Sequence, residues 1–545
     1  MKKWKGSSVK LLEERNWYAE RAFFMCKLYM QQARRLSGLT KNKNQGGGNK
    51  KQGLPSTVGH RPAMFLVKRK THPSKSMVLA DAPVCESLPT DTPYQTCAPW
   101  PHFGGLDNTN SRYTPRLGSQ TGSVLTALVP TTTNYDIFLT SPVIDRNGVL
   151  YLVKQTGVPN VESESLQSYM VAYYPNGTLK WETAFNPGDS INMYNIHLSP
   201  VIGKNGTVFV SSLNGYVYAF NENGSFAWTP KQYATPFGSS AGSVSCQQVA
   251  LQNDRLYFGA NTYIDVRSSL FCASASNGDV LWSYELPDGS TVESSLAIDD
   301  RQHIYFIYKT VQNQSYLLSI DGTTHQPRYA AYNLNNQPPV GIEFFISDFS
   351  NPVLSTDNAL VFVMTTTTVV VQIDTYYTFN CLETVRTSDG QAAFGTLRFE
   401  DTEVNMYKSI IARDLDNRVY FFAGNANNNN ILYGVKNGAI VFTYNPARII
   451  NVPLQIYYGI VVTAPAIGAD GTIYFTSKEV AGVPEYLRVA HAVRPDGVLK
   501  WRKQLPFGYD QRSVSLGYDG TVYCVQDTVV DSEGFPIRST LYSIL

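Results

Sequence analysis

The chain of 545 residues is 12% aromatic but only 16% charged, and its formal net charge is +2. A disordered chain or a coiled coil carries more charge and fewer aromatic residues, so both classes are excluded. Tyr, Phe and Trp favour strands, and one large all-β domain can take up most of this length.

Residues 1–80 carry a large excess of basic charge. They contain 18 Lys and Arg against three Glu, about +15, whereas the remainder contains 27 against 40 Asp and Glu, about −13. Residues 8–36 have good helix formers and an apolar stripe of helical spacing, which predicts an amphipathic helix. Residues 37–76 are rich in Gly, Lys, Asn, Pro and Gln without an acid, so we expect them to be flexible. The stripe consists of Leu12, Ala19, Phe23, Cys26, Met30 and Ala33.

A basic amphipathic arm can serve as a mitochondrial targeting segment, a membrane-surface element, or an anchor on an acidic protein or a nucleic acid. Three glutamates in the predicted helix argue against targeting, because targeting peptides are poor in acids. We expect the arm to anchor the rest of the chain in a larger assembly, such as a virus-like particle. A solubilising tail is the alternative.

Neither a membrane span nor a secretory signal is predicted. No apolar run approaches the roughly 18 residues that a span needs. Arg21 and Lys27 interrupt the apolar patch around residues 22–26, so it does not form a signal sequence. The sequence leaves the localisation open, and we favour association with a particle or complex.

The seven cysteines do not form a metal-binding pattern, because no C-x-x-C pair and no Cys/His cluster occurs. Cys85 and Cys97 are near enough in the chain to close a small loop. We expect reduced thiols instead, and no metal site.

A repeated pattern begins at about residue 145. A polar turn is followed by alternating apolar residues that end in an aromatic residue, as in Asp145–Tyr151. The mean spacing of about 53 residues fits a four-stranded propeller blade with variable loops. The eight occurrences end at Tyr151, Phe209, Tyr257, Tyr305, Phe362, Tyr420, Tyr474 and Tyr523.

Six units contain a second signal, an Asn-Gly or Asp-Gly pair followed closely by Trp or Phe. Such pairs supply the positive φ angles of a tight hairpin turn. We expect the aromatic residue to pack between adjacent blades, with ligand stacking as the alternative. The predicted blade-packing residues are Trp181, Trp228, Trp282, Phe394, Phe442 and Trp501, together with Trp100 before the repeats.

The eighth unit, residues 513–545, ends where its fourth strand is expected to begin. An apolar run at 122–129 precedes the first full unit without a partner of its own, so it is predicted to complete the eighth blade. The resulting organisation is a basic arm (1–80), a lead-in segment (81–118) and an eight-bladed β-propeller (119–545). Seven blades is the alternative, because the fourth and fifth units lack Trp.

The segment Trp100-Pro-His-Phe-Gly-Gly105, followed by Arg112, resembles the W-P-x-F-x-G…R segment of pyrroloquinoline-quinone-binding-like propellers. The Asp-Gly-x-(Val/Leu)-x-Trp ends of the units are similar to that family's repeat. The resemblance covers about residues 98–545. It implies a propeller fold, whereas the functions of the family range from dehydrogenases to an outer-membrane assembly lipoprotein.

The enzymatic branch of that family implies a quinone held over a Trp, a disulfide between adjacent cysteines, a calcium ion and a catalytic Asp. This chain has no two adjacent cysteines, and its units use Asn-Gly or Asp-Gly where the dehydrogenases use Thr-Gly. No cofactor residue is carried over, and the non-enzymatic branch is favoured.

No catalytic constellation is predicted elsewhere. The seven histidines are scattered, and His303 and His491 lie in strand patterns where a hydrogen-bonded structural imidazole is expected. Asp299 and Asp414 occupy turns before strands, where Asp suits the geometry. The polar runs at 365–368 and 427–430 are interpreted as hairpin loops, with contact to a ligand as the alternative.

The sequence therefore predicts a non-catalytic binding or scaffold protein that uses its propeller faces for macromolecular partners. A glycan-binding or small-ligand-binding propeller is the first alternative, and a quinone-dependent dehydrogenase is the second. No catalytic, cofactor-binding or metal-binding residue is predicted.

Overall fold

The described part of the chain begins at residue 93. It belongs to the second of two units into which the chain divides, Leu79–Leu545. The predicted arm, with its helix at 8–36, lies outside the described residues, and so does the lead-in segment up to residue 92. The computed structural model describes residues 93–105, 108–131, 136–157, 167–187, 189, 199–234, 244–262, 268–334, 344–372, 375–401, 410–423, 431–446, 459–461, 463–480, 486–506, 508, 512–530 and 536–545.

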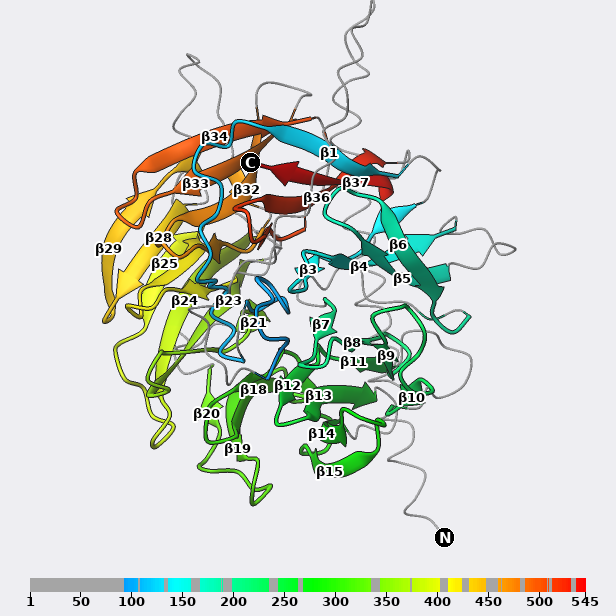
Figure 1. Ribbon diagram of the computed structural model, residues 1–545. Helices are drawn as coiled ribbons and strands as arrows, with labels where there is room; N and C mark the ends of the chain where they lie inside the picture. Colours follow the sequence, from blue (N-terminus) through cyan, green and yellow to red (C-terminus); the bar gives the residue numbers. More distant parts are fainter. Residues whose placement is uncertain are drawn as a thin grey trace, which may run out of the picture. The chain divides into compact units, whose positions relative to one another are not determined.

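Eight antiparallel sheets form a ring, so the predicted eight-bladed β-propeller is confirmed (Figure 1). From the inner to the outer strand, blade 1 consists of β2 (Ile137–Phe138), β3 (Val143–Ile144), β4 (Leu150–Thr156), β5 (Gln167–Tyr173) and β6 (Leu179–Ala184), and blade 2 of β7 (Val201–Ile202), β8 (Val208–Ser211), β9 (Tyr216–Phe220) and β10 (Lys231–Gln232). Blade 3 consists of β11 (Val244–Cys246), β12 (Ala250–Gln252), β13 (Arg255–Thr262), β14 (Ser269–Ser274) and β15 (Val280–Glu285), and blade 4 of β16 (Thr291–Val292), β17 (Ala297–Ile298), β18 (His303–Lys309), β19 (Ser315–Asp321) and β20 (Tyr332–Asn333).

The second half of the ring repeats this order. Blade 5 consists of β21 (Phe344–Phe349), β22 (Val353–Leu354), β23 (Leu360–Gln372), β24 (Thr375–Arg386) and β25 (Leu397–Asp401), and blade 6 of β26 (Ala412–Arg413), β27 (Val419–Ala423), β28 (Ile431–Lys436) and β29 (Ala439–Tyr444). Blade 7 consists of β30 (Gly459–Val461), β31 (Ala466–Ile467), β32 (Ile473–Val480), β33 (Tyr486–Val493) and β34 (Leu499–Leu505), and blade 8 of β35 (Ser515–Leu516), β36 (Val522–Val530), β37 (Pro536–Ile544) and β1 (Leu125–Pro130).

Every blade has four strand positions. In five blades two short strands share the innermost position, because both pair with the same second strand, as β2 and β3 do with β4. The interruption between the two pieces leaves a short irregular stretch next to the axis of the ring in each of these blades.

Blade 8 combines strands from the two ends of the described chain. β1 pairs antiparallel with β37, with Leu125 opposite Ile544 and Pro130 opposite Thr540. In Figure 1 the cyan strand β1 lies beside the dark red strand β37. The pairing covers the edge of β37 and closes the ring, because it joins residues about 400 positions apart in the sequence.

The two ends of the ring differ. At one end, here called the turn face, lie the turns between first and second strands and between third and fourth strands. Neighbouring turns of one blade are hydrogen-bonded there, as the Gly322 amide donates to the Gln302 carbonyl at 3.0 Å. The opposite end, the loop face, carries the other described connections, such as the turn at 310–314 between β18 and β19.

An aromatic residue near the outer strand of most blades packs on the turn of the next blade. The ring lies against a glycine there, where no side chain intervenes, and the Trp181 indole also donates to the Glu222 carbonyl at 2.8 Å. At the junction of blades 3 and 4, Trp282 stacks on His325 instead. The other pairs are Trp181 with Gly224, Trp228 with Gly278, Tyr329 with Gly390, Phe394 with Gly438, Phe442 with Gly497 and Trp501 with Gly122.

A β-bulge precedes this aromatic residue in blades 1, 3, 6 and 7. In blade 1, Ala172 pairs with Trp181 and the adjacent Tyr173 pairs with Leu179, so Lys180 is the extra residue. Bulges bend a strand and change the direction of the following side chain. The bulge thus turns the aromatic residue toward the next blade.

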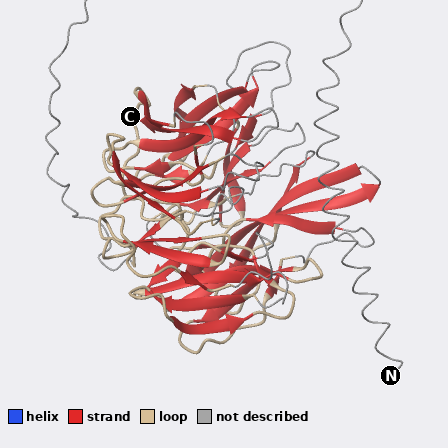
Figure 2. Ribbon diagram, turned by 90° about the vertical axis from the view of Figure 1, so that its right-hand side faces the viewer, coloured by secondary structure: helices blue, strands red, loops and turns tan. Residues whose placement is uncertain are grey.

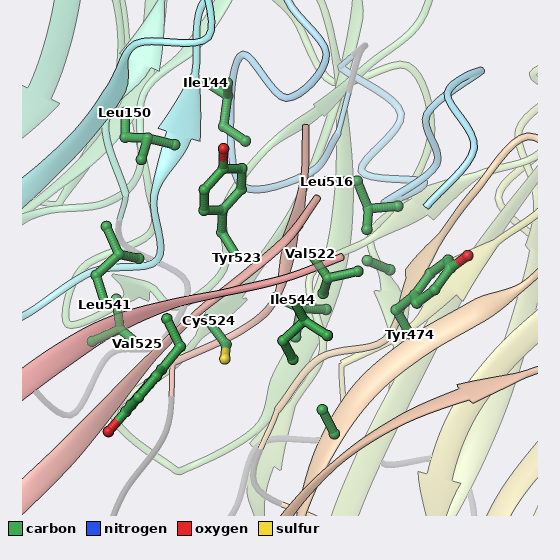
Figure 3. Packing of buried hydrophobic residues seen from close by; sticks show 14 of the residues in the cluster. Ile144, Leu150, Tyr474, Leu516, Val522, Tyr523, Cys524, Val525, Leu541 and Ile544 are labelled. Carbon is green, nitrogen blue, oxygen red and sulfur yellow. The ribbon is translucent and has the colours of Figure 1, made fainter. Parts of the chain in front are cut away.

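The apolar core consists of clusters between adjacent blades. Figure 3 shows the cluster where blade 8 meets its two neighbours, with Tyr474 from blade 7 and Ile144 from blade 1 on either side of Val522 and Tyr523. These side chains are buried, so each blade depends on both neighbours to cover its faces.

Blade 5 has the longest strands, because β23 and β24 contain 13 and 12 residues. Figure 2 shows a long hairpin that extends from one side of the ring. Thr365 pairs with Cys381 and Thr368 with Thr378, so the run 365–368 lies within a strand. Our interpretation of this run as a hairpin loop was wrong, since β-branched residues favour continuation of the strand.

The contact between aromatic residue and glycine predicts the effect of a small substitution. Gly224 has a φ of +87°, and an added Cβ would lie 2.7 Å from the Trp181 ring. We expect Gly224→Ala to lower the free energy of unfolding by about 2 kcal/mol or more, through backbone strain and overpacking. Thermal unfolding measures this effect.

Gly395→Ala is the matched control, because no atom lies within 4 Å of the added Cβ. An equal loss of stability in both variants would show that the aromatic contact is not responsible.

Candidate functional site: the hub segment

One stretch of chain crosses the centre of the ring at the turn face. Its described residues are 93–105 and 108–118, here called the hub segment, and they appear in blue in the middle of Figure 1. In the described part of the chain it hydrogen-bonds to the innermost strand of all eight blades, or to the residue next to that strand. The bonds, in blade order, are Ile144 N to Trp100 O (2.7 Å), Ile202 N to Pro101 O (2.9 Å), Asn108 Nδ2 to Leu251 O, Ile298 N to Asn108 O (3.0 Å), Leu354 N to Thr109 O (3.0 Å), Arg413 N to Ser111 O (2.8 Å), Ile467 N to Arg112 O (2.9 Å) and Arg112 Nη2 to Val514 O (3.0 Å).

Five consecutive residues, 108–112, make the contacts to blades 3 through 8. Asn110 donates from Nδ2 to the Leu296 carbonyl of blade 4 at 2.9 Å and to the Pro352 carbonyl of blade 5 at 3.0 Å. Both amide hydrogens are therefore used. Asn110 and Arg112 have positive φ angles of 56° and 53°, which bend the segment around the axis.

Arg112 is buried, and its guanidinium bonds only to carbonyl groups. Nε donates to Pro465 at 2.7 Å, Nη1 to Phe103 at 2.6 Å and Nη2 to Val514 at 3.0 Å. Burial lowers the pKa of Arg112 to about 9. Among the described residues no carboxylate forms an ion pair with it, so three main-chain carbonyls stabilise the charge.

Aromatic rings cover the same guanidinium. Its carbon lies 4.4 Å from the centre of the Phe103 ring and 5.4 Å from that of Trp100. The Trp, Phe and Arg of the W-P-x-F-x-G…R pattern are thus in direct contact. Trp100 is buried where blades 1, 7 and 8 meet, whereas the other six predicted aromatic residues lie in or just before the outer strands.

Small polar side chains next to the axis connect neighbouring blades beyond the hub segment. The Asn351 side chain of blade 5 accepts from the Ser295 amide of blade 4 at 2.9 Å, and the Ser295 hydroxyl donates to Gln248 of blade 3 at 3.3 Å. Similarly, the Ser515 hydroxyl of blade 8 donates to the Pro142 carbonyl of blade 1 at 2.6 Å. These buried groups satisfy one another and hold the inner strands together.

The two histidines expected to be structural have hydrogen-bond partners. His491 is fully buried, where bonds join its Nδ1 to the Tyr444 hydroxyl at 3.2 Å and its Nε2 to the Ser477 hydroxyl at 2.8 Å. His303 Nδ1 lies 2.7 Å from Asp299 Oδ2 in the turn before β18.

The turn aspartates cap the strands that follow them. Oδ1 of Asp299 accepts from the amides of Arg301 and His303, and Oδ1 of Asp414 accepts from those of Asp416 and Arg418. Their geometry is that of turn residues.

Cys97, in the hub segment, is disulfide-bonded. The expectation of reduced thiols was wrong for this residue, whose partner lies outside the described residues. The remaining described cysteines are free and buried, and burial raises the pKa of Cys272 to about 11 and of Cys524 to about 12. A buried thiol with a raised pKa is a poor nucleophile.

Glu383 is a carboxyl group buried between blades 4 and 5. It accepts from the Thr396 hydroxyl at 2.9 Å and from the Tyr332 hydroxyl at 3.3 Å. Burial raises the pKa of Glu383 above its ordinary value, and these two hydrogen bonds lower it by less. The group fits a structural role, because both partners are neutral hydroxyls.

Within the described ranges, no group of three or more His, Cys, Asp or Glu is placed to hold a metal ion. No described helix is long and apolar enough to cross a membrane. The polar run at 427–430 lies outside the described residues.

Comparisons with known proteins find no matching family model and no matching curated protein. Solved structures match at low similarity. Dihydro-heme d1 dehydrogenase NirN is 12% identical, covering 68% of this chain and 71% of that one with a TM-score of 0.39. Hydrazine synthase of Kuenenia stuttgartiensis is 12% identical, covering 59% and 90%, with a TM-score of 0.35.

The β-propeller domain of the Trilobed protease from Pyrococcus furiosus is 9% identical, covering 69% of this chain and 96% of that one with a TM-score of 0.34. At such identities and scores these matches support no inference about activity or ligands.

The environment of Arg112 predicts a large effect of its replacement. Arg112→Met would leave three buried carbonyls without donors, and each unsatisfied group costs about 1–3 kcal/mol. We expect the free energy of unfolding to fall by about 3 kcal/mol or more, measured by thermal or denaturant unfolding. Arg146→Met, at an exposed position, is the control. Wild-type stability of Arg112→Met would contradict this account of the hub segment.

The raised pKa of Glu383 predicts a pH dependence. The folded state binds its proton more tightly than the unfolded state, so stability falls as the pH rises from about 4.5 through the raised pKa. Glu383→Gln, which has no such proton, should unfold at a higher temperature than wild type at pH 7.5 and show a smaller advantage at pH 4.5. Asp254→Asn at an exposed turn is the control. A constant difference between wild type and Glu383→Gln at the two pH values would exclude this explanation.

Proposed function

We propose that this protein is a non-catalytic scaffold whose propeller faces bind macromolecular partners and whose basic arm, residues 1–80, anchors it in a larger assembly. The hub segment is the observation that supports this proposal best. The residues that resemble a family motif bond to the blades, and the Arg112 guanidinium bonds to three carbonyls. The polar groups of these residues thus hold the ring together by hydrogen bonds to the blades.

The arm precedes this hub segment in the sequence, with residues 81–92 between them. The described chain begins at residue 93, and the Gln95 amide donates to the Ile202 carbonyl of blade 2 at 3.2 Å. A pull on the chain before residue 93 would therefore act on a segment bonded to eight blades. This connection suits an anchor, because a pulling force on the arm would be distributed over all eight blades.

The arm carries about +15 charges and the remainder about −13. Contact of the arm with an acidic protein surface or nucleic acid would weaken as salt rises. We also propose that the propeller belongs to the non-enzymatic branch of the pyrroloquinoline-quinone-binding-like family. The contact of Trp100, Phe103 and Arg112 gives the shared motif a structural role that does not require a cofactor.

The test is removal of residues 2–80. We expect a folded propeller, seen as an unchanged thermal unfolding midpoint, and loss of incorporation into the native assembly. A full-length variant with the 18 Lys and Arg of the arm replaced by Gln separates charge from length and should also fail to incorporate. Unchanged incorporation of both variants would refute the proposed anchor.

A second assay separates a scaffold from an enzyme. The full chain, incubated with pyrroloquinoline quinone and calcium, is assayed for dye-linked alcohol oxidation, and we expect no turnover above a blank. Appreciable turnover would overturn the proposal, whereas binding on a glycan array without turnover would favour the ligand-binding alternative.

A further inference from the structure

The outer edge of blade 6 differs from the other outer edges of the ring. Its outer strand, β29, pairs with β28 on one side, and no strand of the described chain pairs with it on the other. An edge strand leaves a row of main-chain N–H and C=O groups that another strand can bond, and proteins protect such edges with charged residues, proline or short length. β29 has none of these protections, because its six residues, Ala439–Tyr444, include neither a charged residue nor proline.

The other described outer strands are each protected in one of these ways. β10 and β20 have only two residues, and β1 ends in Pro130 after a bulge. β6, β15, β25 and β34 each contain at least one charged residue. β29 is therefore the described edge that is best able to accept a further strand.

Two consecutive residues of β29 have exposed apolar side chains. Ile440 is 49% exposed and Val441 is 50% exposed. A single exposed apolar residue is common on protein surfaces, whereas a contiguous group with a polar rim marks an interaction site. The surroundings of these two residues therefore decide whether they belong to such a site.

Blades 5 and 7 extend this apolar surface on both sides of β29. Phe394 of blade 5 is 36% exposed and packs on Gly438, immediately before the strand. On the other side Phe442 packs on Gly497 of blade 7, and the next residue, Val498, is 49% exposed. Exposed apolar side chains thus follow one another across three blades. They form a group, here called the apolar band, that consists of Phe394, Ile440, Val441 and Val498.

The charged residues in the turns on either side of the apolar band are paired with each other. In the outer turn of blade 5, Arg386 Nη2 lies 3.0 Å from Asp389 Oδ2. In the outer turn of blade 7, Arg494 Nη2 lies 2.8 Å from Asp496 Oδ2. Neither pair adds a net charge beside the apolar band, so these turns do not repel an identical surface.

Blade 3 has the same hairpin with a charged edge. Leu281 is the extra residue of its bulge, as Val441 is in blade 6, and Leu281 is also 50% exposed. Two residues earlier stands Asp279, where blade 6 has Ala439, and Asp279 forms an ion pair with Lys231. A strand that approached this edge would desolvate the ion pair, which costs free energy. Blade 3 is therefore protected where blade 6 is not.

We propose that β29 pairs antiparallel with β29 of a second copy of this chain about a two-fold axis, so that the two blade 6 sheets become one eight-stranded sheet. A β-strand is the occupant that matches the main-chain groups of a sheet edge. Pairing with an identical strand brings like charges together, and β29 avoids this repulsion because it carries no charge. The apolar bands of the two copies then cover each other.

An interface of this kind uses the same surface of both copies, so it closes with two chains and does not continue into a fibre. The inference does not depend on the proposed scaffold function or on the basic arm.

The mass of the full chain in solution tests the proposal. Sedimentation velocity over a dilution series, in high salt that weakens contacts of the arm, should give the mass of two chains of 60.6 kDa each, with dissociation on dilution. Val441→Lys should give the mass of one chain, because it brings like charges to the two-fold interface. Leu281→Lys, at the equivalent exposed position of blade 3, is the matched control and should keep the mass of two chains.

Two further measurements separate loss of pairing from loss of folding. Val441→Glu alone should have the mass of one chain, whereas an equimolar mixture of Val441→Lys and Val441→Glu should regain the mass of two. In wild type, hydrogen exchange of the amides of β29 should become faster on dilution, and that of β15 should not change.

A wild type that has the mass of one chain at every concentration would overturn the proposal and would favour a strand of another protein as the occupant of the edge. A dimer that persists in Val441→Lys, or a mixture of the two charged variants that stays monomeric, would equally contradict pairing through β29.

Discussion

The hydrogen bonds between the hub segment and the eight innermost strands are the constraint on which the rest of the ring depends. Most blade contacts in a propeller join neighbours, and a ring with only such contacts can open at any one of them. The hub segment bonds to every blade, and Arg112 reaches Val514 across 402 positions in the sequence. The bond from Arg112 to Val514 needs blade 8 in place, and closing a loop of this length costs conformational entropy.

The segments that close the ring adjoin each other in the chain. The hub segment ends at residue 118 and β1 begins at Leu125, so one stretch supplies both the centre of the ring and the outer strand of blade 8. Trp501 of blade 7 rests on Gly122 between them and donates to the Ser119 carbonyl at 2.7 Å. Closure at the centre and closure at the edge are therefore coupled.

Features with a local sequence signal were predictable. The turn residues and the alternation of apolar residues predict eight units, and the structure has eight blades. This prediction succeeded because a two-residue turn and the periodicity of a strand are determined within a few residues. Tyr329 was missed as a packing residue of blade 4, because six residues separate it from the Asp321-Gly322 pair and it is neither Trp nor Phe.

The structural role of the asparagines in the hub segment was the hardest feature to predict from the sequence. A polar run of Asn and Ser is typical of a surface loop, whereas Asn108 and Asn110 are buried against carbonyls 143 to 242 positions away. Hydrogen-bond partners this far apart in the sequence cannot be inferred from a local sequence pattern. The disulfide of Cys97 was missed because spacing alone does not decide between a thiol and a bridge.

Hydrogen exchange measured by mass spectrometry tests the central claim most directly, using Arg112→Lys, which keeps the charge but not the planar fork. If the hub segment makes the ring one cooperative unit, exchange should accelerate at inner-strand amides of distant blades as well, including Ile298 of blade 4 and Leu354 of blade 5. Acceleration confined to blades 7 and 8 would contradict the account, because it would show that each blade holds its own part of the hub independently.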